Sequence, residues 1–205
     1  MKRNLTIGFT IIIIVIISIS CIAFGSPLRN DNEKGKDTLL SLEEYEKEYG
    51  KSDTIVHLSE GEITDEDYFG DGSLIVKGKL KDIRGVIFSV GESPCIVYEL
   101  EVTDTIVNST GKEHKIVNFV IPEMIIPRLE DKLQMDQESL FYLTLYDEPF
   151  PHLKEEYYDL ISITRGIVNF SENSEDKESY KQLKKNLTER KKDFDKKNKK
   201  NKKNR

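Results

Sequence analysis

The sequence predicts a mainly β protein built around a small five-stranded antiparallel barrel. Three observations lead to it: apolar and polar residues alternate over much of the chain, one uncharged run stands near the start, and basic residues gather near the end. They divide the chain into a signal peptide or membrane anchor (1–25), a flexible linker (26–37), a short helix with an acidic loop (38–72), the β domain (73–170) and a charged, basic, largely disordered tail (171–205).

The first segment has the length and composition of an apolar membrane helix. Its 20 residues from Leu5 to Phe24 carry no charge and follow two basic residues, and a helix of about 20 residues spans about 30 Å, the thickness of a bilayer core. Three interpretations stay open: an uncleaved transmembrane anchor, a signal peptide cleaved after Gly25, and a lipoprotein signal in which Cys21 carries the lipid. The short basic start and the polar stretch that follows favour export, so we expect the body at the cell membrane on the extracytoplasmic side, or secreted if the signal is cleaved.

A short helix is predicted ahead of the β domain. The stretch "DTLLSLEEYEKEYG" places Asp37 where a helix would be capped and Gly50 where it would end. Its apolar residues recur at helical spacing, at Leu39, Leu42, Tyr45 and Tyr49. The acidic stretch "DEDYFGDG" (65–72) lacks the spacing of a calcium-binding EF-hand loop and is predicted to be a turn.

From Ser73 the apolar period changes to two, the period of β-strands. The predicted strands are "SLIVKGKL", "CIVYELEV", "KIVNFVI", "SLFYLTLYDE" and "YYDLISIT", with a short last one at "GIVNF". Each has one polar face, which indicates an antiparallel sheet. After the third strand, Pro122 and Pro127 exclude a long helix, but a short one from about Arg128 fits. Five main strands with a helical insertion after the third indicate a small OB-like barrel, although an open sandwich would give a similar pattern.

The same strands carry a family resemblance between Ser73 and Phe170. In their order, with Gly78 and Gly166 at fixed places, "SLIVKGKL", "IVYELEV", "ESLFYLTLYDE" and "YYDLISITRGIVNF" resemble bacterial exported proteins and lipoproteins with an OB-like, netrin-module-like barrel. The resemblance implies an extracytoplasmic barrel on an anchor or a lipid, and it supplies no catalytic residues. This chain departs from the pattern after the third strand, where "IPEMIIPRL" replaces the Gly-rich turn that such proteins often have.

No catalytic, metal-binding or cofactor-binding motif stands in the sequence. The three histidines are isolated, the two cysteines cannot form a zinc site, and neither a nucleophile elbow nor a phosphate-binding glycine loop is present. Glu99 and Glu101 alternate with apolar residues and are expected on an ordinary solvent face. Cys95 is expected to be buried rather than reactive. We therefore expect a protein that is not an enzyme and binds no cofactor.

The C-terminal tail has the opposite charge to the rest of the chain. From Lys181 to Arg205 there are 13 Lys and Arg against 3 Asp and Glu, which leaves 18 against 34 upstream. Four apolar residues at helical spacing predict a transient helix up to about Phe194, and disorder is expected after it. The tail is either a solubilising extension, a partner for the acidic body, or an electrostatic tether. As a tether, it would contact anionic wall polymer or lipid headgroups through Lys191, Lys192, Lys196, Lys197, Lys199, Lys200, Lys202, Lys203 and Arg205.

These observations favour a non-enzymatic, membrane-tethered binding or interaction module of the cell envelope, held to the membrane by its N-terminal segment. The alternative is a single-stranded nucleic-acid-binding OB protein with a basic tail. Nucleic acid is the less favoured partner, because an acidic body would repel phosphates and its strands present Glu rather than stacking aromatic rings. The sequence does not identify a protein partner.

Overall fold

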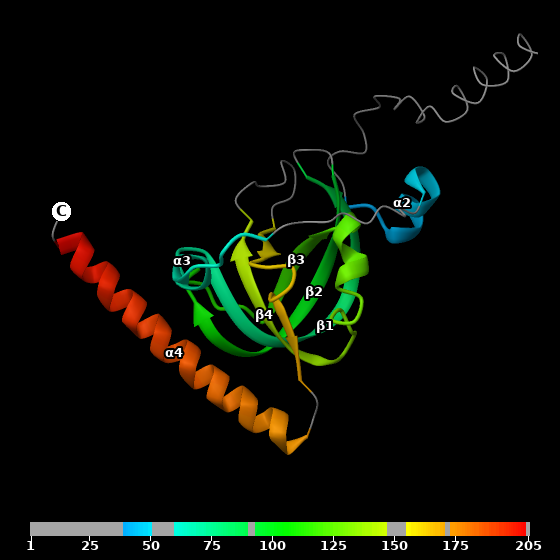
Figure 1. The fold of residues 1–205 in the computed structure, drawn as a ribbon. Coiled ribbons are helices and arrows are strands. Elements are labelled where there is room, and N and C mark those ends of the chain that lie inside the picture. Colours follow the sequence, from blue (N-terminus) through cyan, green and yellow to red (C-terminus); the bar gives the residue numbers. More distant parts are fainter. Residues whose placement is uncertain (1–38, 51–59, 90–92, 147–154, 171–172, 204–205) are drawn as a thin grey trace, which may run out of the picture. The chain divides into compact units, whose positions relative to one another are not determined.

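The computed structural model describes residues 39–50, 60–89, 93–146, 155–170 and 173–203 (Figure 1). The chain divides into two compact units, Met1–Glu33 and Lys34–Arg205, and every described residue belongs to the second. The predicted membrane segment, the linker and Cys21 lie outside the described residues. In the part of the chain that is described, no helix combines the length and the apolar character needed to cross a bilayer.

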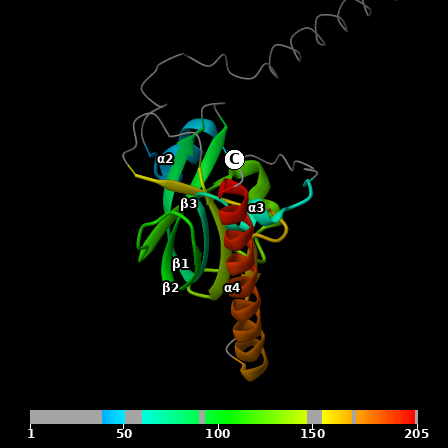
Figure 2. The same cartoon turned by 90° about the vertical axis from the view of Figure 1, so that its left-hand side faces the viewer.

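One six-stranded sheet dominates the second unit. It contains β1 (Ser73–Phe88), β2 (Pro94–Asn108), β3 (Ile116–Pro122), β4 (Glu138–Leu145), β5 (Tyr157–Leu160) and β6 (Ile167–Asn169). The strands are hydrogen-bonded in the order β1-β2-β3-β5-β4-β6, and β1 also pairs with β4 (Figures 1 and 2). The first five strands therefore close into a ring, called the β ring below, and the predicted mainly β fold with five main strands is confirmed.

The prediction that the sheet is antiparallel throughout is wrong at one pair, because β3 and β5 run parallel. The other pairings in the sheet are antiparallel. The reason is geometric: strand direction must alternate around a fully antiparallel ring, and an odd number of strands cannot alternate and still close. Local alternation of apolar residues contains no information on this closure.

β1 bends so that it takes part in both sides of the β ring. It pairs with β2 along its length and with β4 over Ser73–Lys79, and its register with β2 shifts at four places. Such bulges bend a strand and increase its twist. Gly78 lies at one of these shifts, where a Cβ atom would stand 2.4 Å from the carbonyl oxygen of Glu101. Only glycine permits this approach of the two backbones.

The inward face of each strand supplies the main core. Its buried members are Leu74, Val76, Leu80, Tyr98, Leu100, Val117, Phe119, Ile121, Ile125, Leu129, Phe141, Leu143, Tyr158, Leu160 and Ile167. Ile125 belongs to a 3₁₀ helix, η2 (Glu123–Arg128), and Leu129 follows it directly. The helix predicted to begin near Arg128 therefore ends there. The apolar residues of "EMIIPR" draw this segment onto the core, and Pro122 fits at its start because the first residues of a helix need no backbone donor.

Two short helices precede β1. α2 (Leu42–Tyr49) begins at a capping box between Ser41 and Glu44 and ends at Gly50, whose φ is 77°. It confirms the predicted helix with a later start, and Asp37 lies outside the described residues. The acidic stretch predicted to be a turn forms a helix first, α3 (Asp65–Phe69), because Thr64 caps its N-terminus.

The chain continues after β6 in α4 (Ser174–Lys203), a helix of 30 residues. The sequence suggested a transient helix to about Phe194 and disorder after it, whereas α4 reaches Lys203. Packing explains the stable part: Tyr180, Leu183, Leu187 and Phe194 join an outer apolar cluster of the β ring. The last turn adds lysines, which are good helix formers.

Candidate functional site

α4 is attached to the β ring through apolar contacts at its centre. Leu187 is only 3% exposed and packs in a cluster with residues of β1, β2, β4 and α3, namely Ile75, Val107, Leu140, Tyr142 and Phe69. The ring of Phe194 stands 5.9 Å from that of Phe69. Figures 1 and 2 show α4 running along the outside of the sheet. The helix is therefore a packed part of the unit.

Charged contacts surround this apolar centre and tie the basic helix to the acidic body. The hydroxyl of Tyr180 donates to Asp104 at 2.6 Å, and the ammonium of Lys184 pairs with the same carboxylate. Arg190 pairs with Asp65 at 2.5 Å. These contacts use part of the positive charge of the tail internally, as one of the sequence interpretations expects.

The structure places the predicted tail residues in different surroundings. Lys191 faces the body, since its ammonium donates to the carbonyl oxygen of Phe69 at 3.0 Å. Lys196 pairs with Asp193 on its own helix at 3.2 Å. Four lysines are exposed and make no hydrogen bond or ion pair to any described residue: Lys192, Lys197, Lys199 and Lys200. Lys202 and Lys203 lie in the last turn of α4, and Arg205 lies outside the described residues.

One face of α4 carries a regular series of unpaired lysines. Lys185, which the sequence prediction did not include, stands seven residues before Lys192 and fourteen before Lys199, and all three are exposed. At 3.6 residues per turn this spacing puts them on one side of the helix. The barrel-facing series Tyr180, Leu187 and Phe194 has the same spacing with an offset of five residues, which is a rotation of about 140°. The lysines, called the lysine face below, therefore point away from the β ring.

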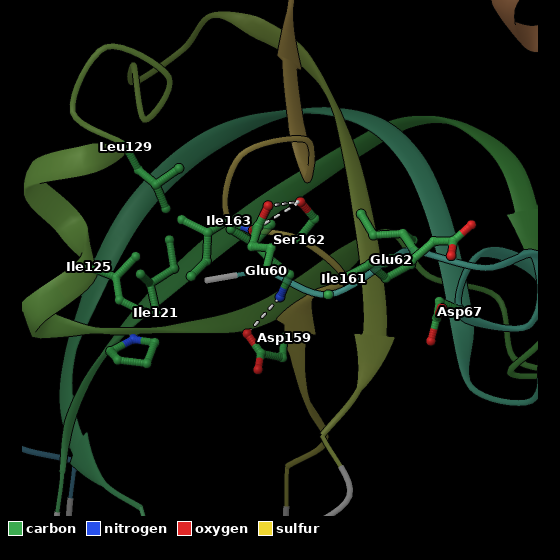
Figure 3. Close-up of a pocket in the computed structure, with 14 residues that line it drawn as sticks. Glu60, Glu62, Asp67, Ile121, Ile125, Leu129, Asp159, Ile161, Ser162 and Ile163 are labelled. Carbon is green, nitrogen blue, oxygen red and sulfur yellow. Dashed lines mark hydrogen bonds between the residues drawn. The ribbon is translucent and has the colours of Figure 1, made fainter. Parts of the chain in front are cut away.

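A second feature is a pocket of about 340 Å³ between β3, η2, β5 and the segment before α3 (Figure 3). Its size is at the low end of the range for ligand pockets, about 300–1,000 Å³. In Figure 3, Ile121, Ile125 and Leu129 lie on one side of Glu60, and the carboxylates of Glu62 and Asp67 lie on the other. The pocket thus joins an apolar wall to an acidic rim.

The carboxylate of Glu60 is held by the turn at Ser162, Ile163 and Thr164, called the carboxylate cradle below. The hydroxyl of Ser162 donates to both carboxylate oxygens at 3.1 Å, and the backbone N–H of Thr164 donates at 3.0 Å. The N–H of Ile163 and the hydroxyl of Thr164 donate as well. Burial acts to raise the pKa of Glu60, but the hydrogen bonds from Thr164, Ser162 and Ile163 outweigh it, so the pKa is lowered and Glu60 stays ionised.

Asp159 lies deeper, where the pocket meets a second one of about 300 Å³ that contains Cys95 and Tyr146. One oxygen of Asp159 accepts a hydrogen bond from the N–H of Leu160 at 2.7 Å. Burial raises the pKa of Asp159 to about 6, and that hydrogen bond opposes the rise. Cys95 is 3% exposed, and burial together with the charge of Asp159 raises the pKa of its thiol to about 12. The thiol is therefore buried and protonated, as the sequence predicts.

The remaining polar residues that the sequence singled out are separated from one another. Glu101 pairs with Lys81 on the surface at 3.4 Å, and the Nε2 atom of His114 lies 2.8 Å from the hydroxyl of Thr110. His57 and His152 lie outside the described residues. Across the described ranges, no group of three His, Cys, Asp or Glu side chains could hold a metal ion.

No protein-family model matches the chain, and the search of curated proteins gives no match. The lysine face of α4 and the carboxylate cradle with its pocket therefore carry the functional argument.

Proposed function

We propose that this protein is a non-enzymatic, membrane-tethered module of the cell envelope, and that its lysine face contacts anionic wall polymer or lipid headgroups on the extracytoplasmic side. The observation that carries the proposal is the orientation of α4. One side of the helix is packed on the β ring, and Lys185, Lys192 and Lys199 project from the other. A docked helix holds these charges in a fixed row, so a surface can meet all of them without first ordering the segment.

The magnitude of the expected attraction is sufficient for a secondary contact. Each basic residue close to an anionic membrane surface contributes about 1 kcal/mol, so the three lysines of the lysine face together contribute about 3 kcal/mol, or roughly 100-fold in affinity. This is weak for a free protein, but it adds to a tether that already holds the body near the surface. The contact should also weaken with salt, because exposed charges are screened over about 8 Å at physiological ionic strength.

The architecture supports an OB-like barrel as the body of this module. A ring of five strands that closes through a parallel β3–β5 pair, with a helical segment between β3 and β4, fits that barrel better than an open sandwich. Single-strand nucleic-acid binding gains no such support. Among the described residues Tyr49 is the one aromatic ring counted as exposed, and it lies on α2 rather than on the sheet. Stacking platforms need several such rings.

Vesicle binding tests the lysine face directly. The fragment of residues 34–205 contains every described element and its own core, so it can be mixed with vesicles without the N-terminal segment. We expect it to sediment with phosphatidylglycerol vesicles at low salt and not with phosphatidylcholine vesicles. Replacing Lys185, Lys192 and Lys199 by Gln should weaken the binding about 10- to 100-fold.

The matched control removes the same charge elsewhere, through Lys47→Gln, Lys79→Gln and Lys115→Gln. The proposal requires that this control binds like the wild type. Equal losses in the two triple variants would show that net charge alone matters, and a wild type that binds neither anionic vesicles nor purified anionic wall polymer would refute the proposal. Purified polymer in place of vesicles distinguishes the two sources of negative charge.

A further inference from the structure

The carboxylate cradle is built independently of the carboxylate that it holds. The hydroxyl oxygen of Ser162 accepts a hydrogen bond from the N–H of Arg165 at 2.9 Å, and the carbonyl oxygen of Ser162 accepts one from the N–H of Gly166 at 2.8 Å. A Cβ atom at position 166 would stand 2.2 Å from that carbonyl oxygen, so the turn requires glycine there. These bonds close the turn without the participation of Glu60.

The β ring also fixes both arms of the turn. The N–H of Ile161 donates to the carbonyl oxygen of Tyr142 at 2.9 Å. The N–H of Tyr142 donates to the carbonyl oxygen of Gly166, also at 2.9 Å. Both arms are therefore bonded to the same residue of β4. The donors of Ser162, Ile163 and Thr164 converge on one point because a rigid element holds them, which is the arrangement expected of a preformed anion site.

Glu60 reaches the cradle through its side chain, from an exposed stretch of backbone. Glu60 is exposed, and the backbone of residues 60–63 makes no hydrogen bond to the backbone of any other described residue. The polar contacts of this stretch to the body come from the Glu60 side chain, which reaches residues more than 100 positions away in the sequence. A carboxylate on an exposed stretch thus occupies a site built from neutral donors on a rigid turn.

We propose that the carboxylate cradle is the binding site for the free C-terminal carboxylate of a partner polypeptide with an apolar last residue, and that Glu60 occupies it as an internal competitor. Backbone N–H groups arranged in this way capture chain termini in other recognition modules. The last side chain of the partner would lie in the adjoining pocket against Ile121, Ile125 and Leu129. This site is separate from the lysine face and does not depend on it.

The pocket favours a chain terminus over a fatty acid, which also carries a carboxylate on an apolar group. The acidic rim of Glu62 and Asp67, together with the deeper Asp159, offers acceptors that suit the N–H groups of a peptide. An alkyl chain has no donors for these carboxylates.

Fluorescence polarisation of labelled peptides on the full-length protein in detergent solution tests the proposal. The probe ends in Ser-Leu-Ile with a free carboxylate, and the same peptide with an amide terminus is its matched control. Glu60→Ala removes the internal competitor, so we expect it to raise the affinity for the free-acid peptide by about tenfold or more. Ser162→Ala combined with Thr164→Val should lower that affinity in the Glu60→Ala protein by about tenfold or more, because two donors to a carboxylate are lost.

Glu113→Ala is the control variant, since Glu113 is an exposed carboxylate that does not line the pocket. It should leave the affinity within about twofold, as expected for a surface change away from the site. If Glu60→Ala does not fold, as judged by its thermal transition, Glu60→Gln is measured in the same assay. The amide has the size of the carboxylate but no charge, so the cradle binds it more weakly.

Three results would overturn the proposal. The first is that neither Glu60 variant raises the affinity for the free-acid peptide, which would leave Glu60 a purely structural strap. The second is equal binding of the acid and amide peptides. The third is that octanoate displaces the probe while the unlabelled free-acid peptide does not, which would assign the cradle to fatty acids.

Discussion

At the scale of single residues, Asp159 is the group with the most informative environment. Its carboxyl group lies between two pockets and, among the described residues, accepts one hydrogen bond, from the N–H of Leu160. Burial therefore favours the neutral form and raises the pKa to about 6, from 3.8 for a free side chain. The folded protein binds this proton more tightly than the unfolded chain does, so the contribution of Asp159 to stability is complete below about pH 4 and is lost as the pH rises through 6.

Asp159→Asn tests this assignment, because it keeps the acceptor for Leu160 and removes the titration. We expect the variant and the wild type to have equal free energies of unfolding at pH 4. At pH 7.5 the variant should be more stable by roughly 2–3 kcal/mol, since the wild type must then bury a charge. Urea denaturation at both pH values measures the difference, and Asp71→Asn at an exposed position is the control. A difference that is the same at pH 4 and pH 7.5 would contradict the raised pKa.

Some features of single residues could be predicted from the sequence, and others could not. The burial of Cys95 could be predicted because it begins an apolar strand, and the breaker role of Gly50 because glycine tolerates its positive φ. The hold of Ser162 and Thr164 on Glu60 could not, since the partners are 102 and 104 residues apart and no local pattern joins them. A cluster of hydroxyl residues followed by Gly166 marks the turn, but nothing near it marks the carboxylate that fills it.

At the scale of elements, α4 shows how packing can override a local pattern. Its composition is dominated by lysines, which repel one another and favour disorder when nothing is buried. Its stripe of four apolar residues is thin, so the sequence indicated only a transient helix. The outer cluster of the β ring supplies the missing partner surface, with Leu187 at its centre. The sequence did not reveal the outer apolar side of the β ring that α4 covers, because Ile75 and Leu140 look like ordinary strand residues in it.

Leu187→Ala should therefore loosen α4 without disturbing the β ring. Replacing a buried leucine by alanine costs about 2–5 kcal/mol, and a helix this highly charged has little stability of its own. Hydrogen exchange should become faster over 174–203 and stay unchanged over β1 to β5. Lys185→Ala on the opposite face is the control and should leave the exchange of α4 slow. Slow exchange of α4 in the Leu187→Ala protein would mean that the helix does not depend on its contact with the ring.

β1 and β2 run eight and six residues beyond their predicted ends, and β5 stops four residues before its predicted end, but the place of each strand was predictable, since a period of two is a strong local signal. Their closure was not. The parallel β3–β5 pair and the place of η2 follow from the need to close an odd ring and to cover its end, and both are properties of the whole fold. Sequence periodicity reports which face of each strand is apolar, and it leaves open which strand lies beside which.

At the scale of the whole molecule, the unit separates its charges. Lys184 and Arg190 meet Asp104 and Asp65 of the acidic body, while the lysine face points away from it. The body upstream of the tail has an excess of acidic residues, 34 against 18, and would be repelled by the same anionic surface that attracts the lysine face. We infer that the molecule would meet such a surface with α4 first.

The proposed role of the lysine face depends most on which side of the membrane α4 occupies. A tag on the C-terminus of the full-length protein, followed by protease treatment of intact cells beside a sample of burst cells, measures this directly. Loss of the tag from intact cells is the predicted result, because it places the lysine face among wall polymers and outer headgroups. A tag that survives until the cells are opened would contradict the account, since α4 would then face the cytoplasm and its partners would be nucleic acid or the inner leaflet.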